Sequence, residues 1–164
     1  IARALFAAPA TVGITATASD PDGTIASVGF YLGSSLIGTA TVAPYSITSP
    51  VLSAGSYTLT AVATDNAGLS TTSASVPISV ATPPTAAFTY PCLALTCTFD
   101  GASSQGEVTY YIWDFGDTTG TYDGRLVTHT YSRPGTYTVS LVVSNVISVS
   151  SATRDVTVRK SARK

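Results

Sequence analysis

Apolar and polar residues alternate along most of this chain, with a period of two. In the first half, such runs begin near residues 12, 28, 57 and 76, and in the second half near residues 111 and 137. A period of two is the pattern of a β-strand with one buried face. Turn sequences separate the runs, among them SDPDG, TDNAG, GDTTG and SRPG. The pattern predicts an all-β fold built from antiparallel β-sandwiches.

The two halves also share a longer sequence pattern. GSYTLTAVATDNAG at 55–68 and GTYTVSLVVSNVIS at 135–148 both read Gly-x-Tyr-Thr followed by alternating apolar residues. This repeat indicates two related domains in tandem. Pro83 and Pro84 cannot continue a hydrogen-bonded ladder and mark the seam. We predict domains at 1–82 and 83–160, with 161–164 as a basic tail or linker stub.

Tyr57 and Tyr137 occupy the same position in the two repeats, at the start of a strand just after a glycine. A tyrosine at this point of a sandwich can pack its ring against the core and return its hydroxyl to the backbone, as in a tyrosine corner. Both residues are therefore expected to be structural.

Composition and charge exclude several classes of function. Of the 164 residues, 45% are hydrophobic and 10% charged, which suits a folded core and not a disordered tail. The net charge of −1 provides no field for binding nucleic acid. No apolar stretch approaches the length of a membrane span.

The second half resembles the PKD (polycystic kidney disease) domain family. The resemblance rests on AAFTY, CTFDGASS, YYIWDFGD, VTHTYSRPGTYTVSLVVSN and SATRDVTV, within residues 83–158. The first half is similar to bacterial Ig-like domains of secreted glycoside hydrolases and surface proteins, through ITATASDPDGTIASVGFYLGSSLIGTATVAPYSIT and AGSYTLTAVATDNAG. These resemblances imply two tandem Ig-like antiparallel β-sandwich domains.

The stretch IWDFGD, residues 112–117, raises the question of catalysis. Its Asp114-Phe115-Gly116 matches a kinase metal motif, but the chain lacks the accompanying glycine-rich loop, strand lysine and catalytic loop. Asp114 and Asp117 are local neighbours, as turn residues often are. The PKD resemblance implies that Trp113 and Phe115 belong to the core. His129 has no nucleophile motif near it, so we expect no catalytic residue.

The PKD resemblance also bears on the two cysteines, Cys92 and Cys97. Related domains of secreted bacterial proteins often carry cysteines placed in this way, and a tight loop can bring such a pair within bridging distance. We predict a disulfide, which implies an oxidising, extracytoplasmic setting. With two cysteines and one histidine in the chain, a zinc site is not expected.

Calcium is the one cofactor for which the sequence offers ligands. Asp20 and Asp22 in SDPDG, with Asp65 and Asn66 in TDNAG, would supply oxygen ligands if the two loops met. The alternative is that all four are turn residues, and turn chemistry alone explains them. Some PKD relatives bind calcium after the ASS sequence, but here that loop reads SSQGEV and lacks most of the acids.

Surface aromatic residues are the remaining candidates for function. Because Tyr111 and Trp113 are expected to point inward, Tyr110 and Ile112 should face outward, and Tyr122 lies in a glycine-rich loop. Exposed aromatic rings can contact sugars or proteins.

We therefore expect a non-catalytic structural and adhesive module pair at a cell or particle surface. Its expected partners are other domains of the same chain or assembly, or an extracellular polysaccharide or protein matrix. Two alternatives stay open. One is an accessory substrate-binding module of a secreted polysaccharidase or protease, and the other is a subunit or decoration protein of a filament or virus-like particle.

Overall fold

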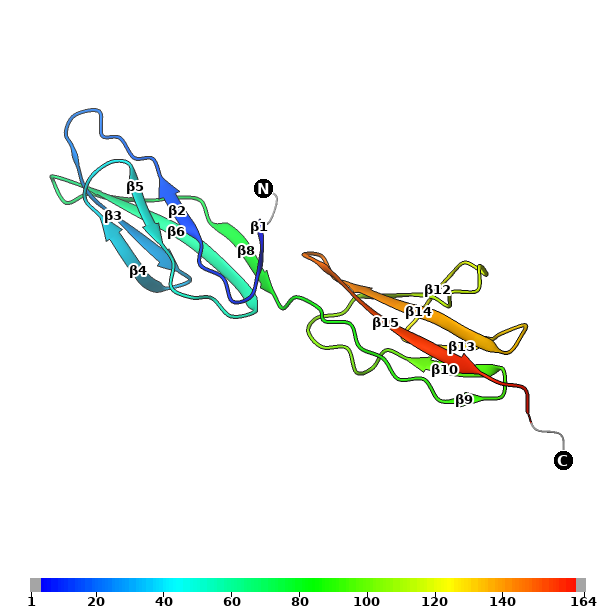
Figure 1. Cartoon of the computed structure of the whole chain (residues 1–164). Helices are drawn as coiled ribbons and strands as arrows, with labels where there is room; N and C mark the ends of the chain where they lie inside the picture. The colour runs from blue at the N-terminus through cyan, green and yellow to red at the C-terminus, as the bar shows by residue number, and fades with distance from the viewer. Residues whose placement is uncertain (1–3, 162–164) are drawn as a thin grey trace. The chain divides into compact units, whose positions relative to one another are not determined.

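The computed structural model describes residues 4–161, and all regular elements in this range are strands (Figure 1). The chain divides into two compact units between Thr82 and Pro83. No helix among these residues is long and apolar enough to cross a membrane.

The first domain is a sandwich of two unequal sheets. The larger sheet has the order β1-β8-β6-β3-β4, with β7 also paired to β6, and the smaller consists of β2 and β5. The strands are β1 (Ala4–Ala7), β2 (Gly13–Ala16), β3 (Ile25–Leu32), β4 (Ser35–Ala40), β5 (Tyr45–Thr48), β6 (Gly55–Asp65), β7 (Ser70–Thr72) and β8 (Val76–Ala81).

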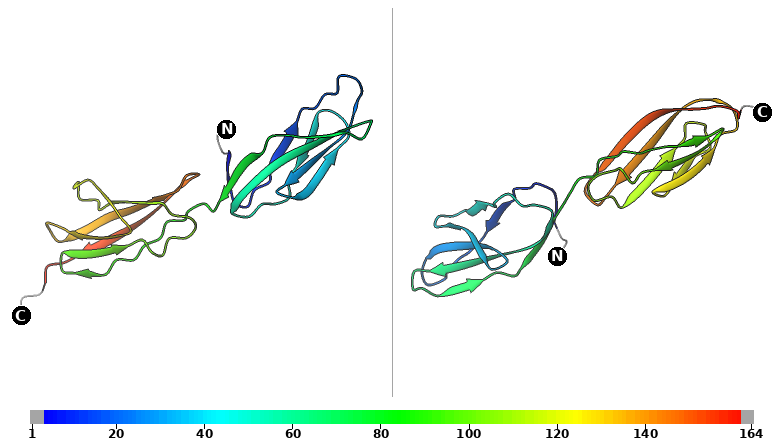
Figure 2. Two further views of the ribbon diagram at one scale, coloured as in Figure 1. Left: turned by 180° about the vertical axis from the view of Figure 1, so that it is seen from behind. Right: turned by 90° about the horizontal axis from the view of Figure 1, so that it is seen from below.

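The second domain has the same two-layer arrangement (Figure 2). One sheet has the order β12-β11-β14-β15 and the other β13-β10-β9. The strands are β9 (Cys92–Leu93), β10 (Thr96–Asp100), β11 (Tyr110–Asp114), β12 (Thr121–Asp123), β13 (Leu126–Thr130), β14 (Gly135–Ser144) and β15 (Val149–Val158).

The core of the second domain is rich in aromatic rings. Trp113 and Phe115 are fully buried, and Phe88 and Phe99 pack against Trp113 at ring distances of 5.1 and 5.6 Å. The Trp113 Nε1–H donates to the Gly124 carbonyl at 2.7 Å. Alternation along β10 and β11 places Phe99 and Trp113 inward because successive residues of a strand face opposite sides of its sheet.

Both tyrosine corners have the geometry that the repeat suggests. The Tyr57 hydroxyl donates to the Ser53 carbonyl at 2.9 Å, and the Tyr137 hydroxyl donates to the Arg133 carbonyl at 3.0 Å. Both rings are partly buried at the edge of the core. Each corner ties the turn before a central strand, β6 or β14, to that strand.

The leading segments of the two domains follow different paths. In the first domain, β1 pairs in parallel with β8. In the second, Thr85 and Thr89 form antiparallel bridges to Gln105 and Asp100, so this segment lies along the β10 side of its sandwich. The opening residues of the first domain gave no sequence signal for this pairing with the last strand.

Candidate functional site

The turn after β11 is held by its own carboxylates. Asp114 Oδ1 accepts from the Gly116 N–H at 2.8 Å, and Asp117 Oδ1 accepts from the Thr119 hydroxyl at 2.6 Å. Gly116 has a φ of +71°, a conformation that favours glycine. The two aspartates therefore shape the turn through local hydrogen bonds.

Asp117 also contacts His129 at hydrogen-bond distance, which the sequence did not reveal. His129 Nε2 lies 2.7 Å from Asp117 Oδ2, and both side chains are largely buried. The imidazole stacks on Phe115 at 4.2 Å and meets Tyr131 edge-on at 4.7 Å. The pair joins the turn after β11 to β13 of the opposite sheet, so its position indicates a structural role.

The surroundings of Asp117 favour its charged form. Burial raises the pKa of this carboxyl, but hydrogen bonds from Thr119 and His129 outweigh burial and hold the pKa below its usual value. Because the folded-state pKa is lower than the unfolded one, the carboxylate stabilises the fold above the unfolded pKa. This stabilisation is lost as the pH falls through the folded value.

We expect Asp117→Asn to lower the free energy of unfolding at neutral pH, because the contacts of the charged Asp117 carboxylate with Thr119 and His129 are lost. The difference from the parent protein should shrink at acidic pH, as the pH falls through the lowered pKa of Asp117 and the parent carboxylate also takes up a proton. Urea unfolding at neutral and at acidic pH measures this effect. Asp114→Asn, at an exposed carboxylate of the same turn, is the control, and an equal pH dependence of the two variants would contradict this role for Asp117.

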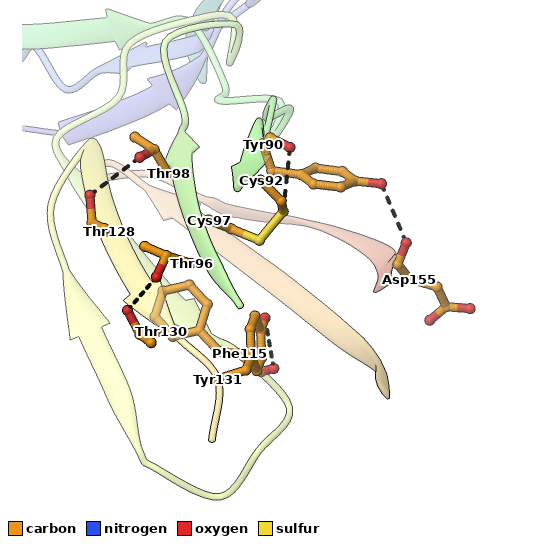
Figure 3. Close-up of a disulfide and its surroundings, with 10 residues drawn as sticks. All are labelled: Tyr90, Cys92, Thr96, Cys97, Thr98, Phe115, Thr128, Thr130, Tyr131 and Asp155. Carbon is orange, nitrogen blue, oxygen red and sulfur yellow. Dashed lines mark hydrogen bonds between the residues drawn. A yellow bond between two sulfur atoms is a disulfide. The ribbon is translucent and has the colours of Figure 1, made fainter. Parts of the chain in front are cut away.

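The predicted disulfide is present. Cys92 and Cys97 are bonded, with Cα atoms 4.0 Å apart, and they face each other across the β9–β10 hairpin (Figure 3). Cys97 is fully buried, whereas Cys92 lies on the exposed edge strand β9. The bridge closes the loop beside the core and fits an oxidising environment.

The two loops proposed for calcium do meet, but as hydrogen-bonded turns. Asn66 Oδ1 accepts from the Thr24 N–H at 3.1 Å, and Asp65 Oδ1 accepts from the Ala67 and Leu69 N–H groups. Asp20 Oδ1 faces the Asp22 N–H at 3.4 Å. Within residues 4–161, no group of three or more acidic, histidine or cysteine side chains is arranged to hold a metal. Asp65 and Asn66 thus use their side-chain oxygens to accept backbone hydrogen bonds within and between the two turns.

The three predicted contact residues differ in orientation. Tyr110 is 65% exposed and Ile112 is 39% exposed, both on the outer face of β11. Tyr122 pairs with Trp113 across β11 and β12, so it lies on the inner face. Its ring packs on Phe115 at 5.2 Å. Tyr122 is therefore mainly a cover for the core, which the glycine-rich sequence around it concealed.

Tyr110 and Ile112 belong to a wider apolar strip on the outer face of this sheet. Across the ladder, Tyr110 is opposite Ser144, and Ile112 is opposite Val142. Val149, which is 65% exposed, pairs with the other side of Ser144. We call Tyr110, Ile112, Val142, Ser144 and Val149 the outer strip. It combines one large aromatic ring with aliphatic and hydroxyl side chains.

Two family models match the chain. Residues 81–159 match the PKD domain model, and residues 2–61 match the bacterial Ig domain model. No curated protein matches it.

Several solved structures are similar to this chain. The fibronectin(III)-like modules of Clostridium thermocellum CbhA match at 21% identity and a TM-score of 0.50, over 98% of this chain and 91% of theirs. The amphioxus IgVJ-C2 molecule matches at 10% identity and a TM-score of 0.58, over 94% and 99%. The PKD1 domain of Vibrio anguillarum Epp is 27% identical over 49% of this chain and 99% of its own, with a TM-score of 0.46. The first two matches support the fold of consecutive sandwiches and nothing more.

Proposed function

We propose that this chain, whose two parts match the bacterial Ig and PKD domain models, is a non-catalytic extracellular module pair. It acts as a spacer and as a surface that contacts protein or glycan. Members of both families are typically extracellular or surface modules without catalytic activity. The Cys92–Cys97 disulfide supports the same setting, since such bonds persist in oxidising compartments.

The arrangement of the acidic residues supports a role without catalysis. Paired-carboxylate enzymes place two acids on either side of a substrate cleft. Here Asp114 holds its own turn, while Asp117 is bonded to Thr119 and His129. Both carboxylates are used to build the fold.

A spacer must resist deformation, and several features of the second domain favour this. β14 and β15 form an uninterrupted ladder of ten residue pairs, from Gly135–Val158 to Ser144–Val149. Threonine pairs reinforce the ladders, as Thr96 with Thr130 and Thr98 with Thr128 do across β10 and β13 (Figure 3).

The outer strip is the observation that carries the proposed contact. The exposed Tyr110 ring lies at the start of the central strand β11, where its backbone pairs with Ser144 of β14. A tyrosine on a rigid surface offers a large contact area at low entropic cost. The neighbouring hydroxyl of Ser144 adds a polar group, as a sugar or peptide partner requires.

The same strip favours one more specific function, an accessory module that binds the substrate of a secreted polysaccharidase or protease. A flat aromatic ring beside hydroxyl groups can stack on a sugar ring, and an apolar strip can receive a fibrous protein. The two substrate classes make different predictions for binding to insoluble material.

Sedimentation with insoluble polysaccharides and with collagen-like protein tests the proposal. We expect the full chain to be retained by one of these materials, and Tyr110→Ala to reduce the affinity about five-fold, the loss expected for one aromatic contact. Leu126→Ala is the matched control, because Leu126 is also exposed, at 60%, but lies on the other sheet. Equal retention of the two variants would contradict a contact through the outer strip.

A further inference from the structure

A groove runs along one flank of the first domain, between its two sheets. Two adjoining hollows, about 540 and 420 Å³ in volume, share the lining residues Ala16, Thr17, Ala61 and Ser73. One wall is β2 and the loop that follows it, and the other is formed by β6, β7 and β8. Phe30 of β3 lies at the base.

β2 presents an unpaired edge to this groove. Among the described strands, it is paired with β5 alone. The Val12 carbonyl accepts a hydrogen bond from the Ser49 N–H, on the side of β2 that faces β5. In an antiparallel pair, every second residue of a strand directs its N–H and C=O groups to the same neighbouring strand. Ile14 and Ala16 therefore also bond toward β5, while the peptide groups of Gly13 and Thr15 point to the other edge. Gly13 and Thr15 are both exposed, and a Cβ atom added at Gly13 would meet no atom within 4 Å.

The second domain shows what fills the equivalent flank of its own sandwich. β10 corresponds to β2, since each pairs with the strand that precedes the tyrosine-corner strand. The Thr89 N–H donates to Asp100 at 3.0 Å, and the Asp100 N–H donates back at 2.9 Å. Phe88 lies between the bridges that Thr85 and Thr89 form, and its side chain enters the core and is 1% exposed. An extended antiparallel segment, with Phe88 buried and Tyr90 packed against the core, thus completes this side.

In the first domain, the leading strand pairs with β8 and leaves the flank open. Phe6 of β1 pairs opposite Val80 and borders only one end of the groove. The groove is lined mainly by small or apolar side chains, as a strand with compact inward residues requires.

The charged residues of the groove indicate which kind of strand could bind there and in which direction it would run. Among the described lining residues, the only charged ones are Asp20 and Asp65, both at the end of the groove beyond β2. An antiparallel strand would begin at this end, so basic residues at its amino end would face the two carboxylates.

We propose that this groove binds an extended peptide segment of a partner protein, which adds an antiparallel strand to β2. The segment carries basic residues at its amino end, followed by small residues and one large apolar side chain that enters the groove. This is β-strand addition, in which backbone bonds provide affinity and alternate side chains provide specificity. The site lies in the bacterial Ig domain and does not depend on the outer strip.

A synthetic peptide tests the proposal on the full chain. Its sequence is Lys-Lys-Thr-Ala-Ala-Phe-Thr-Tyr, which places two basic residues before the segment that closes the second domain, residues 85–90. In amide NMR spectra of the labelled chain, we expect saturable shifts at Gly13, Thr15 and Thr17. A control peptide with aspartate in place of the phenylalanine should cause none. The absence of shifts along β2 with the first peptide overturns the proposal.

Three changes in the protein identify the site. Ala61→Phe fills the groove and Thr15→Pro removes a backbone donor from the free edge, so each should weaken peptide binding at least about ten-fold. Retained dispersion of the amide spectrum shows that each variant is folded. The double change Asp20→Asn with Asp65→Asn should weaken binding about three-fold, as expected for exposed ion pairs. Asp114→Asn, at a turn carboxylate of the other domain, should have no effect.

The same variants separate a partner peptide from a second copy of the chain. Sedimentation of the free chain should be unchanged by Ala61→Phe if the occupant is a partner segment. If the parent chain forms dimers that Ala61→Phe abolishes, the occupant is a second copy and the proposal is overturned. Full peptide affinity in both folded variants, Ala61→Phe and Thr15→Pro, would overturn it as well.

Discussion

Replacing Trp113 with alanine is expected to lower the free energy of unfolding of the second domain by about 4 kcal/mol, the cost typical of removing a fully buried large aromatic side chain. The ring is 0% exposed and contacts Phe88 and Phe99. Its loss leaves a cavity and also removes the Nε1–H donor to the Gly124 carbonyl. A loss of this size is a large fraction of the free energy of unfolding of a typical small domain.

Calorimetry of the full chain measures this effect. Trp113 packs inside its own unit, so the transition of the second domain should shift to lower temperature or disappear while that of the first domain remains. Trp113→Phe, which keeps a ring in the core, is the control and should cost less. A shift shared equally by both transitions would contradict a core confined to the second domain.

Gly116→Ala is expected to destabilise the same domain by about 3 kcal/mol, through two effects that add. The φ of +71° disfavours any residue with a Cβ atom. The new Cβ would also lie 2.5 Å from the Thr138 carbonyl oxygen on β14, which is a backbone atom and cannot rotate away. The turn of IWDFGD is thus packed directly against the central strand.

Gly120→Ala separates the two effects. Gly120 also has a positive φ, of +95°, but a Cβ there would meet nothing within 4 Å. Gly120→Ala should therefore lower the free energy of unfolding by about 1 kcal/mol, the cost of the unfavourable backbone conformation alone. Chemical unfolding of both variants gives the comparison, and equal losses would show that the approach to Thr138 is unimportant.

Local sequence patterns were sufficient for much of this fold. The period of two places Trp113 and Phe115 inward and Tyr110 outward because one face of each strand is buried. The repeat of Tyr57 and Tyr137 predicts two corners whose hydrogen bonds span only four residues. Features set by neighbouring residues can be read in this way.

Features set by contacts between distant strands could not be predicted so well. The Asp117–His129 pair spans both sheets, and its only signal is that His129 shares the inward alternation of Val127 and Tyr131. Tyr122 lies in a glycine-rich sequence, but its register opposite Trp113 turns it inward. The groove beside β2 is open because β1 pairs with β8 and not with β2. The alternation of apolar and polar residues does not specify which strand β1 pairs with.

The most direct test of the central claim compares Tyr110→Ala with Asp117→Asn for binding to the retaining polysaccharide or protein matrix. If the turn carboxylates of IWDFGD build the fold and the outer strip makes the contact, folded Asp117→Asn keeps the affinity of the parent chain. Tyr110→Ala then lowers the affinity about five-fold with unchanged stability. Loss of binding in folded Asp117→Asn, with full binding retained by Tyr110→Ala, would contradict the account.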